Sequence, residues 1–221
     1  MHYFNNDLHV KAWSHRQWII RTINNPELWS SEIEYSHSKV LSDPRNNSAW
    51  NQRWFALHEG NVAYAAVNTN GGGRSASVLS LEKAKEEASY ALSGAKVDSY
   101  NESPWRYLIG VLMEQWRLVQ REGGEVDKVT ELIRETIAAI KEMKRSREEQ
   151  SSSEGSPTES HSIGVCVSLM SALVDLLELF TDEKESLTEA KVICGELMLE
   201  DPVRRKYWYK REKEIVKLLE L

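Results

Sequence analysis

The sequence predicts an all-α protein, a superhelix (solenoid) of helical hairpin repeats with a crescent shape. Three observations lead to this fold class. Apolar residues recur at spacings of three and four, the period of a helix with one buried face, and almost no stretch alternates as a strand would. Tryptophan is frequent, with eight in the chain against three phenylalanines. A tryptophan motif also recurs with a period of about 37 residues, which is long enough for two helices.

Residues that begin or end helices divide the chain into nine expected helices. They lie at about 12–22, 26–41, 48–59, 80–94, 103–121, 126–145, 163–180, 187–199 and 203–221. Asp43 and Pro44 end the second helix, because the residue before a proline is pushed out of the helical region. Asn47 is expected to cap the third helix and Gly60 to end it. Ser103, followed by a proline, is expected to cap the fifth.

The whole chain, 1–221, is expected to form a single repeat domain. Two stretches of small and polar residues interrupt the helical pattern, at about 68–78 and 146–162. Neither stretch can bury enough apolar surface to offset the entropy of ordering it. Both are therefore predicted to be flexible insertions in loops.

Composition argues against several functional classes. The net charge of −6 argues against nucleic-acid binding, which needs a cationic surface to displace counterions from phosphates. No apolar run reaches the ~20 residues needed to cross a bilayer, and the first residues lack the layout of a signal peptide. Cys166 and Cys194 lie in apolar helical patterns, as buried thiols of a reducing compartment do. These features predict a cytoplasmic protein with no membrane insertion.

An aspartate precedes a tryptophan by seven residues in three copies of one motif. The pairs are Asp43 and Trp50, Asp98 and Trp105, and Asp201 and Trp208. A further tryptophan, Trp13, lies 37 residues before Trp50. The interval from Trp105 to Trp208 is 103 residues, about two periods plus the serine-rich insertion, so a degenerate copy is expected near residues 155–175.

Each part of the motif has an expected role. The aspartate ends one helix and turns the chain, asparagine and serine cap the next helix, and the tryptophan fills the seam between helices. Arginine follows three residues after the tryptophan at Arg16, Arg53 and Arg211, whereas the Trp105 copy has Leu108. Because that position shares a helical face with the tryptophan, the arginine is expected to reach exposed carbonyls or the aspartate of an adjacent repeat.

The residues around Trp50 resemble a known repeat. Residues 43–55, Asp-Pro-Arg-Asn-Asn-Ser-Ala-Trp-Asn-Gln-Arg-Trp-Phe, closely resemble the repeat of protein farnesyltransferase and type I geranylgeranyltransferase α subunits. Residues 12–18 resemble the preceding repeat of that family, residues 101–108 a later one and residues 205–208 the terminal one. With four motifs in register, the chain is identified as a member of this prenyltransferase α-subunit repeat family over nearly its whole length, apart from the two insertions.

The resemblance implies a crescent of hairpins wrapped around a separate β subunit. In that family the β subunit carries zinc, with magnesium as an optional further ion, and most of the isoprenoid pocket and of the peptide site. The heterodimer transfers a farnesyl or geranylgeranyl group from its diphosphate to a cysteine near the C terminus of a target protein, and zinc activates the thiolate. The chain is therefore expected to be a transferase subunit that stabilises the β subunit, with no catalytic residue, cofactor or metal of its own.

The resemblance also implies which residues form the repeat motif and the β-subunit interface. They are Trp13, Arg16, Asn47, Trp50, Asn51, Arg53, Asn101, Trp105, Tyr107, Trp208 and Arg211. Lys11 and His15 are the candidates for the diphosphate side. The family usually has tyrosine and histidine where this chain has Val10 and Lys11. Family α subunits also have upstream repeats, one with a lysine thought to touch the diphosphate, so the chain is expected to lack N-terminal repeats and to be inactive alone.

Two other functions stay open at this point. The first is a non-catalytic α-solenoid scaffold that binds other proteins, which the loss of upstream repeats would favour. The second is the α subunit of the Rab-specific geranylgeranyltransferase. The run Asn51-Gln52-Arg53 speaks against it, as does the lack of further domains after the helical array. For His15, a packed or interface histidine is the alternative to a diphosphate contact.

Overall fold

The computed structural model describes residues 3–68, 78–153 and 165–221, and all of their regular structure is helical. The helices are α1 (Tyr3–Ile23), α2 (Pro26–Ser42), α3 (Asn47–Asn68), α4 (Leu81–Val97), α5 (Glu102–Glu122), α6 (Val126–Ser153), α7 (Val167–Leu177), α8 (Lys184–Glu200) and α9 (Arg205–Leu219), with a 3-10 turn at Pro202–Arg204. The all-α fold class is confirmed.

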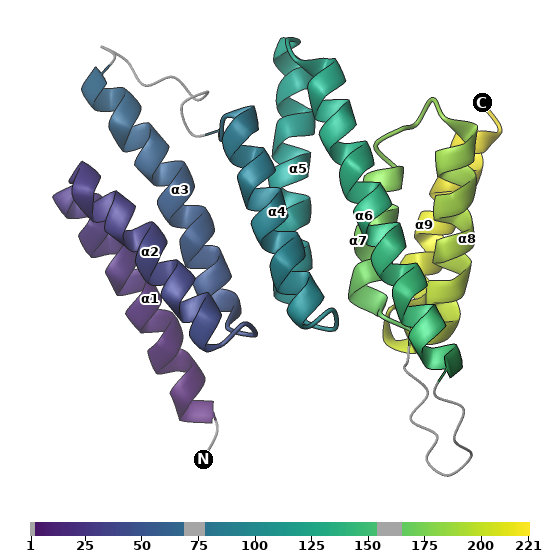
Figure 1. The fold of residues 1–221 in the computed structure, drawn as a ribbon, viewed down its shortest axis with the longest axis horizontal. Helices are drawn as coiled ribbons and strands as arrows, with labels where there is room; N and C mark the ends of the chain where they lie inside the picture. The colour runs from purple at the N-terminus through teal and green to yellow at the C-terminus, as the bar shows by residue number, and fades with distance from the viewer. Residues whose placement is uncertain (1–2, 69–77, 154–164) are drawn as a thin grey trace.

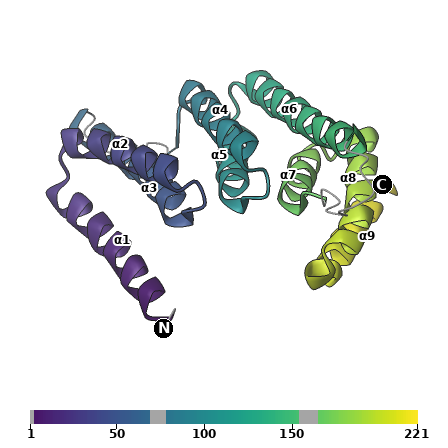
Figure 2. The ribbon, with the colours of Figure 1, turned by 60° about the horizontal axis from the view of Figure 1, so that its bottom comes forward.

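The helices form antiparallel hairpins that stand side by side in one row (Figure 1). The hairpins are α2–α3, α4–α5, α6–α7 and α8–α9, and α1 precedes them in the chain. Figure 2 shows α2, α4 and α6 as an outer row and α3, α5 and α7 as an inner row, with α1 and α9 curving inward at the two ends. Each inner helix packs on the next, α1 on α3, α3 on α5 and α5 on α7. This arrangement is the expected curved solenoid.

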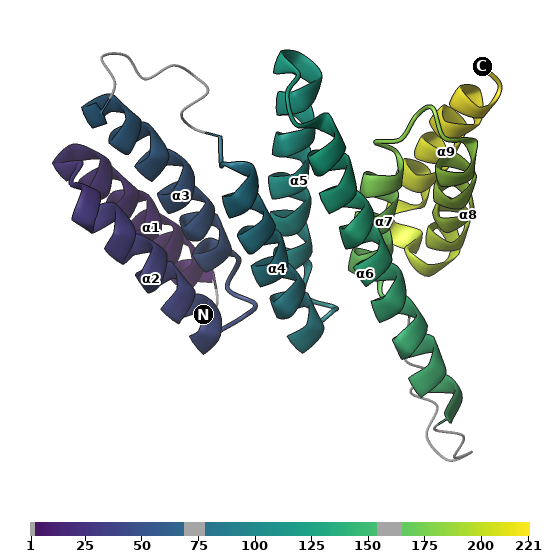
Figure 3. The same ribbon diagram turned by 45° about the horizontal axis from the view of Figure 1, so that its top comes forward.

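Three helices are longer than the sequence pattern indicates. The first begins at Tyr3 rather than at about residue 12. The sixth runs to Ser153 rather than to about residue 145, and its last turns project beyond α7 (Figure 3). The third passes through Gly60 and continues to Asn68. Gly60 is therefore not a helix stop. A Cβ at this position would lie 3.3 Å from the Cβ of Trp29, so the glycine permits α2 to approach α3 closely. Of the two expected insertions, residues 69–77 and 154–162 lie outside the described residues.

The motif aspartates end α2, α4 and α8, with nearly identical backbone geometry at the first two and a similar one at the third. Asp43 has φ −148° and ψ 93°, Asp98 has φ −147° and ψ 94°, and Asp201 has φ −123° and ψ 72°. Each backbone N–H closes the helix by bonding the carbonyl four residues earlier. Each carboxylate accepts a hydrogen bond from a backbone N–H two or three residues later. The aspartate therefore satisfies the amide groups of the turn, as an Asx turn does.

The caps of the inner helices lie earlier than predicted. Asn46, not Asn47, accepts a hydrogen bond from the N–H of Ala49 at 3.3 Å, and Asn47 is exposed. Asn101, not Ser103, is the cap of α5, and its Oδ1 accepts from the N–H of Ser103 at 3.1 Å. In both copies the capping asparagine is the residue four positions before the motif tryptophan.

The indole groups explain why aspartate and tryptophan keep a fixed spacing. All three motif tryptophans are buried, and each indole N–H donates back into the turn that precedes its helix. The acceptors are the carbonyl of Pro44 for Trp50 (2.9 Å), the carbonyl of Ser99 for Trp105 (2.8 Å) and the carboxylate of Asp201 for Trp208 (2.9 Å). The spacing is the chain length that brings the ring over its own turn while the indole N–H stays hydrogen-bonded, as a buried tryptophan requires.

The copy expected near residues 155–175 corresponds to the hairpin α6–α7. Cys166 takes the place of the capping asparagine, and its thiol lies 2.8 Å from the carbonyl of Ser99. Four residues later, the buried Met170 stands where the other copies have tryptophan. The copy is invisible to a tryptophan search because both of its diagnostic residues have changed.

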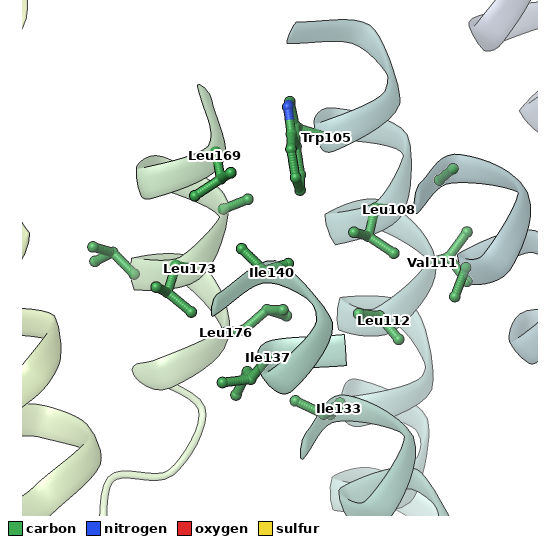
Figure 4. Close-up of a cluster of buried hydrophobic side chains, with 14 of the residues drawn as sticks. Trp105, Leu108, Val111, Leu112, Ile133, Ile137, Ile140, Leu169, Leu173 and Leu176 are labelled. Atoms are coloured by element: carbon green, nitrogen blue, oxygen red, sulfur yellow. The ribbon is translucent and has the colours of Figure 1, made fainter. Parts of the chain in front are cut away.

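The core is continuous along the row of hairpins. Figure 4 shows its centre, where Leu108 of α5 meets the buried isoleucines of α6 and the leucines of α7. A smaller cluster of Ile20, Trp29, Phe55 and Ala63 joins α1, α2 and α3 at the N-terminal end. Each hairpin therefore depends on its neighbours for burial, as expected for a solenoid.

Replacing Asn101 with alanine should destabilise the protein by about 1–2 kcal/mol. Its Oδ1 caps α5, and its Nδ2 donates to the carbonyl of Pro44 in the preceding turn at 2.6 Å. The measurement is urea unfolding followed by circular dichroism. The matched control is Asn47→Ala, an exposed asparagine that should change stability by less than about 0.5 kcal/mol. Equal effects of the two substitutions would contradict the role of Asn101.

Candidate partner-binding surface

A buried glutamate joins α1, α2 and α3 through a polar cluster. Glu32 of α2 is fully buried and accepts hydrogen bonds from Nε and Nη2 of Arg16 at 2.8 and 2.7 Å. Gln52 of α3 donates to the same carboxylate at 2.7 Å, and Gln17 of α1 donates to Gln52 at 3.0 Å. Three helices are thereby held in register by one carboxylate whose hydrogen bonds compensate for its burial.

The next hairpin repeats this arrangement. Glu87 of α4 accepts two hydrogen bonds of 2.7 Å from Arg53 of α3 and one of 2.8 Å from the hydroxyl of Tyr107 of α5. Tyr107 lies two residues after its tryptophan, as Gln52 does in the preceding copy. The two clusters are therefore equivalent, with an arginine from one hairpin and a glutamate and a polar donor from the next.

The electrostatics of the second cluster follow from its burial and its pairing. Burial alone would raise the pKa of Glu87, but the hydrogen bonds and charge of Arg53, together with the Tyr107 hydroxyl, hold it below its ordinary value. Burial and the adjacent carboxylate raise the pKa of Tyr107 far above its usual range. Both effects keep the cluster as an ion pair with a protonated phenol donor.

The arginine contacts differ in part from those predicted. Arg16 and Arg53 reach buried glutamates in the adjacent hairpin, not exposed carbonyls or the turn aspartate. Arg211 of α9 instead points back to α7, with Asp175 at 2.6 Å and Glu178 at 2.7 Å. Burial would lower the pKa of Arg211, but these two carboxylates raise it above its ordinary value.

The glutamates missed by the sequence analysis do have a sequence signal. Glu32 and Glu87 each lie eleven residues before the turn aspartate of their hairpin. Where the arginine position is apolar, at Leu173, the corresponding residue before Asp201 is the buried Ala190. Acid and base thus occur together or are lost together within one chain, because either charge alone would be buried without a partner.

The other residues predicted for the interface or the diphosphate side differ in how exposed they are. Trp13 is half-buried, with its ring 6.0 Å from that of Tyr35, and Asn51 is exposed. Lys11 and His15 are both exposed on α1, and the imidazole of His15 stacks on Trp18 with ring centroids 5.6 Å apart. The tryptophan and arginine side chains of the motif therefore lie mostly in the seams between repeats.

An open hollow of about 840 Å³ lies among the inner-row helices. Its walls come from α3, α5, the end of α7 and α9, which are distant in the sequence. Apolar side chains form part of its surface, namely Trp54, Ile109, Met113, Leu118 and Leu179. Hollows with apolar walls and a few polar groups are where proteins bind partners and ligands.

Gly110 permits a close contact between α5 and Trp54 in the wall of the hollow. A Cβ at this position would lie 3.1 Å from the ring of Trp54, so the absence of a side chain lets α5 and the indole lie against each other. Trp54 also stacks on His58, with ring centroids 3.9 Å apart, and meets Tyr107 edge-on. The indole is fixed in place by these contacts. Trp54 was not predicted as a site residue, although it lies four residues after Trp50 on the same helical face.

Most charges around the hollow are paired within the chain. Arg211 pairs with Asp175 and Glu178, and Nε2 of His58 lies 3.0 Å from the carboxylate of Glu114. Arg106 pairs with Glu102 and Arg121 with Glu122. Arg117 of α5 is exposed, and among the residues with described side chains no carboxylate pairs with it.

The described residues do not assemble a metal site or a membrane span. Within residues 3–68, 78–153 and 165–221, no three His, Cys, Asp or Glu side chains come together as metal ligands would. Burial raises the pKa of Cys194 to about 12 and also raises that of Cys166, so both remain protonated thiols. Within the same residues, no helix combines the length and apolar character that crossing a bilayer requires.

Comparison with known proteins assigns the hairpin unit to a family. Residues 29–59 match the model of the protein prenyltransferase alpha subunit repeat. The matched segment begins on α2 before Glu32, passes through the Asp43 turn and ends on α3 beyond Arg53. It therefore contains the acid, the turn and the tryptophan–arginine pair described above. Residues 29–59 therefore carry this repeat, and the chain is similar to prenyltransferase α subunits.

Two relatives extend the match beyond one repeat. The protein farnesyltransferase/geranylgeranyltransferase type-1 subunit alpha of Arabidopsis thaliana is 35% identical over 81 residues, covering 36% of this chain and 20% of the relative. The protein of the same name from Pisum sativum is 27% identical over 189 residues, covering 85% of this chain and 49% of the relative. This chain thus spans at most about half the length of these relatives.

Proposed function

We propose that this chain is the α-type subunit, or a part of one, of a heterodimeric protein prenyltransferase of the farnesyl or type I geranylgeranyl kind. The single observation that carries the proposal is the repeated construction of the hairpins within this chain, in which Arg16–Glu32–Gln52 and Arg53–Glu87–Tyr107 form equivalent buried clusters. The pea relative, which carries this subunit name, aligns with 85% of the chain.

In this proposal the inner face binds a β-type subunit. The array buries its charged clusters between hairpins, so its shape is fixed before a partner binds, which reduces the entropy lost on association. The hollow bounded by Trp54, Ile109 and Met113 gives that face a recessed apolar area. Apolar recesses rimmed by charges are typical of the centres of protein interfaces.

The chemistry of the transfer belongs to the heterodimer in this proposal. Zinc would deprotonate, and so activate, the cysteine thiol of the target protein. The donors described in this chain do not fit such a site, since Cys166 and Cys194 are buried in separate places and stay protonated. Lys11 and His15, exposed one turn apart on α1, are proposed to face the isoprenoid diphosphate.

The test is co-expression with the farnesyltransferase β subunit of the same organism, followed by size-exclusion chromatography and a transfer assay. The acceptor is a peptide that ends in a prenylation motif. We expect a 1:1 complex, and in an active complex the double change Lys11→Ala and His15→Ala should raise the KM for the diphosphate with little effect on complex formation. A folded, helical chain that forms no complex would refute the proposal and favour a non-catalytic scaffold.

A further inference from the structure

Among the residues whose side chains are described, one cation at the hollow, Arg117, has no counter-ion. Of the four arginines around the hollow, Arg106, Arg121 and Arg211 already contact carboxylates. Arg117 is exposed in the C-terminal third of α5 and, within the residues whose side chains are described, has no acidic partner. An arginine at the edge of a recess, with its fork of donors unoccupied, is suited to bind a carboxylate in a bidentate manner.

The apolar wall of the hollow lies on the same helix as Arg117. Ile109 and Met113 are half-buried and precede it by eight and four residues, so they share its helical face. Trp54 completes this wall from α3 and is held by its contacts with Gly110 and His58. Tryptophan and arginine are the side chains that most often dominate binding at interfaces.

The charges around the hollow disfavour a polyanionic ligand. Arg106, Arg121 and Arg211 are already engaged by carboxylates of the chain, so a diphosphate would have to displace these ion pairs to be neutralised. One unpaired arginine beside an apolar wall instead matches a single carboxylate next to an apolar side chain. Such a pair is what a protein segment presents.

We infer that the hollow is a docking site for a segment of the β-type partner that places a carboxylate on Arg117 and an apolar side chain against Trp54, Ile109 and Met113. The inference rests on the proposed function, because it names the chemistry of the partner at the same inner face. It predicts that one charge and one apolar contact determine much of the affinity.

The test compares two charge reversals in the complex with the farnesyltransferase β subunit. Arg117→Glu should weaken binding at least about 10-fold, mainly through faster dissociation. Lys85→Glu is the matched control, since it changes the net charge equally at an exposed position of α4, in the outer row. It should stay within about 2-fold of the unmodified chain. Binding is measured by surface plasmon resonance, with circular dichroism to verify that both variants are folded.

A third variant tests the apolar half of the docking site. Met113→Glu places a charge on the apolar wall and should also weaken binding at least about 10-fold. Affinities of Arg117→Glu and Met113→Glu equal to that of Lys85→Glu would overturn the inference and leave the proposed function intact. Failure of the unmodified chain to bind the β subunit would overturn the proposed function and the inference with it.

Discussion

Replacing Trp50 with alanine should lower the free energy of unfolding by about 3–5 kcal/mol. The side chain is 1% exposed and packs against the rings of Tyr90 and Tyr107, each 5.4 Å away between centroids. Its loss opens a cavity at the seam between two hairpins. It also removes the indole donor to the carbonyl of Pro44, which then retains only the amide of Asn101.

The measurement is urea unfolding by circular dichroism, with hydrogen exchange to locate the effect. In a solenoid each hairpin contacts only its neighbours, so protection should fall first in α3, α4 and α5 and less in α8 and α9. Trp18→Ala is the matched control, because Trp18 is 60% exposed and its removal should cost less than about 0.5 kcal/mol. A uniform loss of protection along the whole chain would contradict this account of the seam.

Replacing Glu87 with glutamine should destabilise the protein by about 3–5 kcal/mol. Glu87 is 1% exposed, and the neutral side chain would leave the buried guanidinium of Arg53 without a counter-charge. Glu86→Gln is the matched control on the adjacent residue, since that carboxylate is 61% exposed and its pair with Lys83 contributes about 0–1 kcal/mol. The combined change Arg53→Met with Glu87→Leu should recover much of the loss, because no buried charge remains.

The same cluster gives stability a defined pH dependence. The pKa of Glu87 is lower in the folded protein than its unfolded value of about 4.3. Its contribution is therefore fully present above that unfolded value and is lost as the pH falls through the folded pKa. Glu87→Gln should be less sensitive to acid over this interval than the unmodified chain. Parallel stability curves between pH 7 and pH 3 for both proteins would refute the assignment.

Most of the fold can be predicted from the sequence because the residues that define the repeat act through local contacts. Asp43, Asp98 and Asp201 end helices through their own backbone and side-chain hydrogen bonds, and a tryptophan follows each at a fixed spacing. Such contacts lie within seven residues, so pattern and spacing are sufficient to predict them. The error in the predicted cap of α3 is also local. Asn46 and Asn47 are adjacent and both can cap a helix, so the sequence does not distinguish them.

What the sequence determined by itself is the all-α class, the order of the hairpins and the likeness of residues 29–59 to the prenyltransferase α-subunit repeat. What only the tertiary structure decided is which side chains meet across hairpins. The partners Arg53 and Glu87 are 34 residues apart, and the walls of the hollow come from residues as distant as Trp54 and Arg211. Those contacts depend on the stacking angle of successive helices. That angle is set by packing details such as the missing side chain at Gly110, and no periodicity in the sequence encodes it.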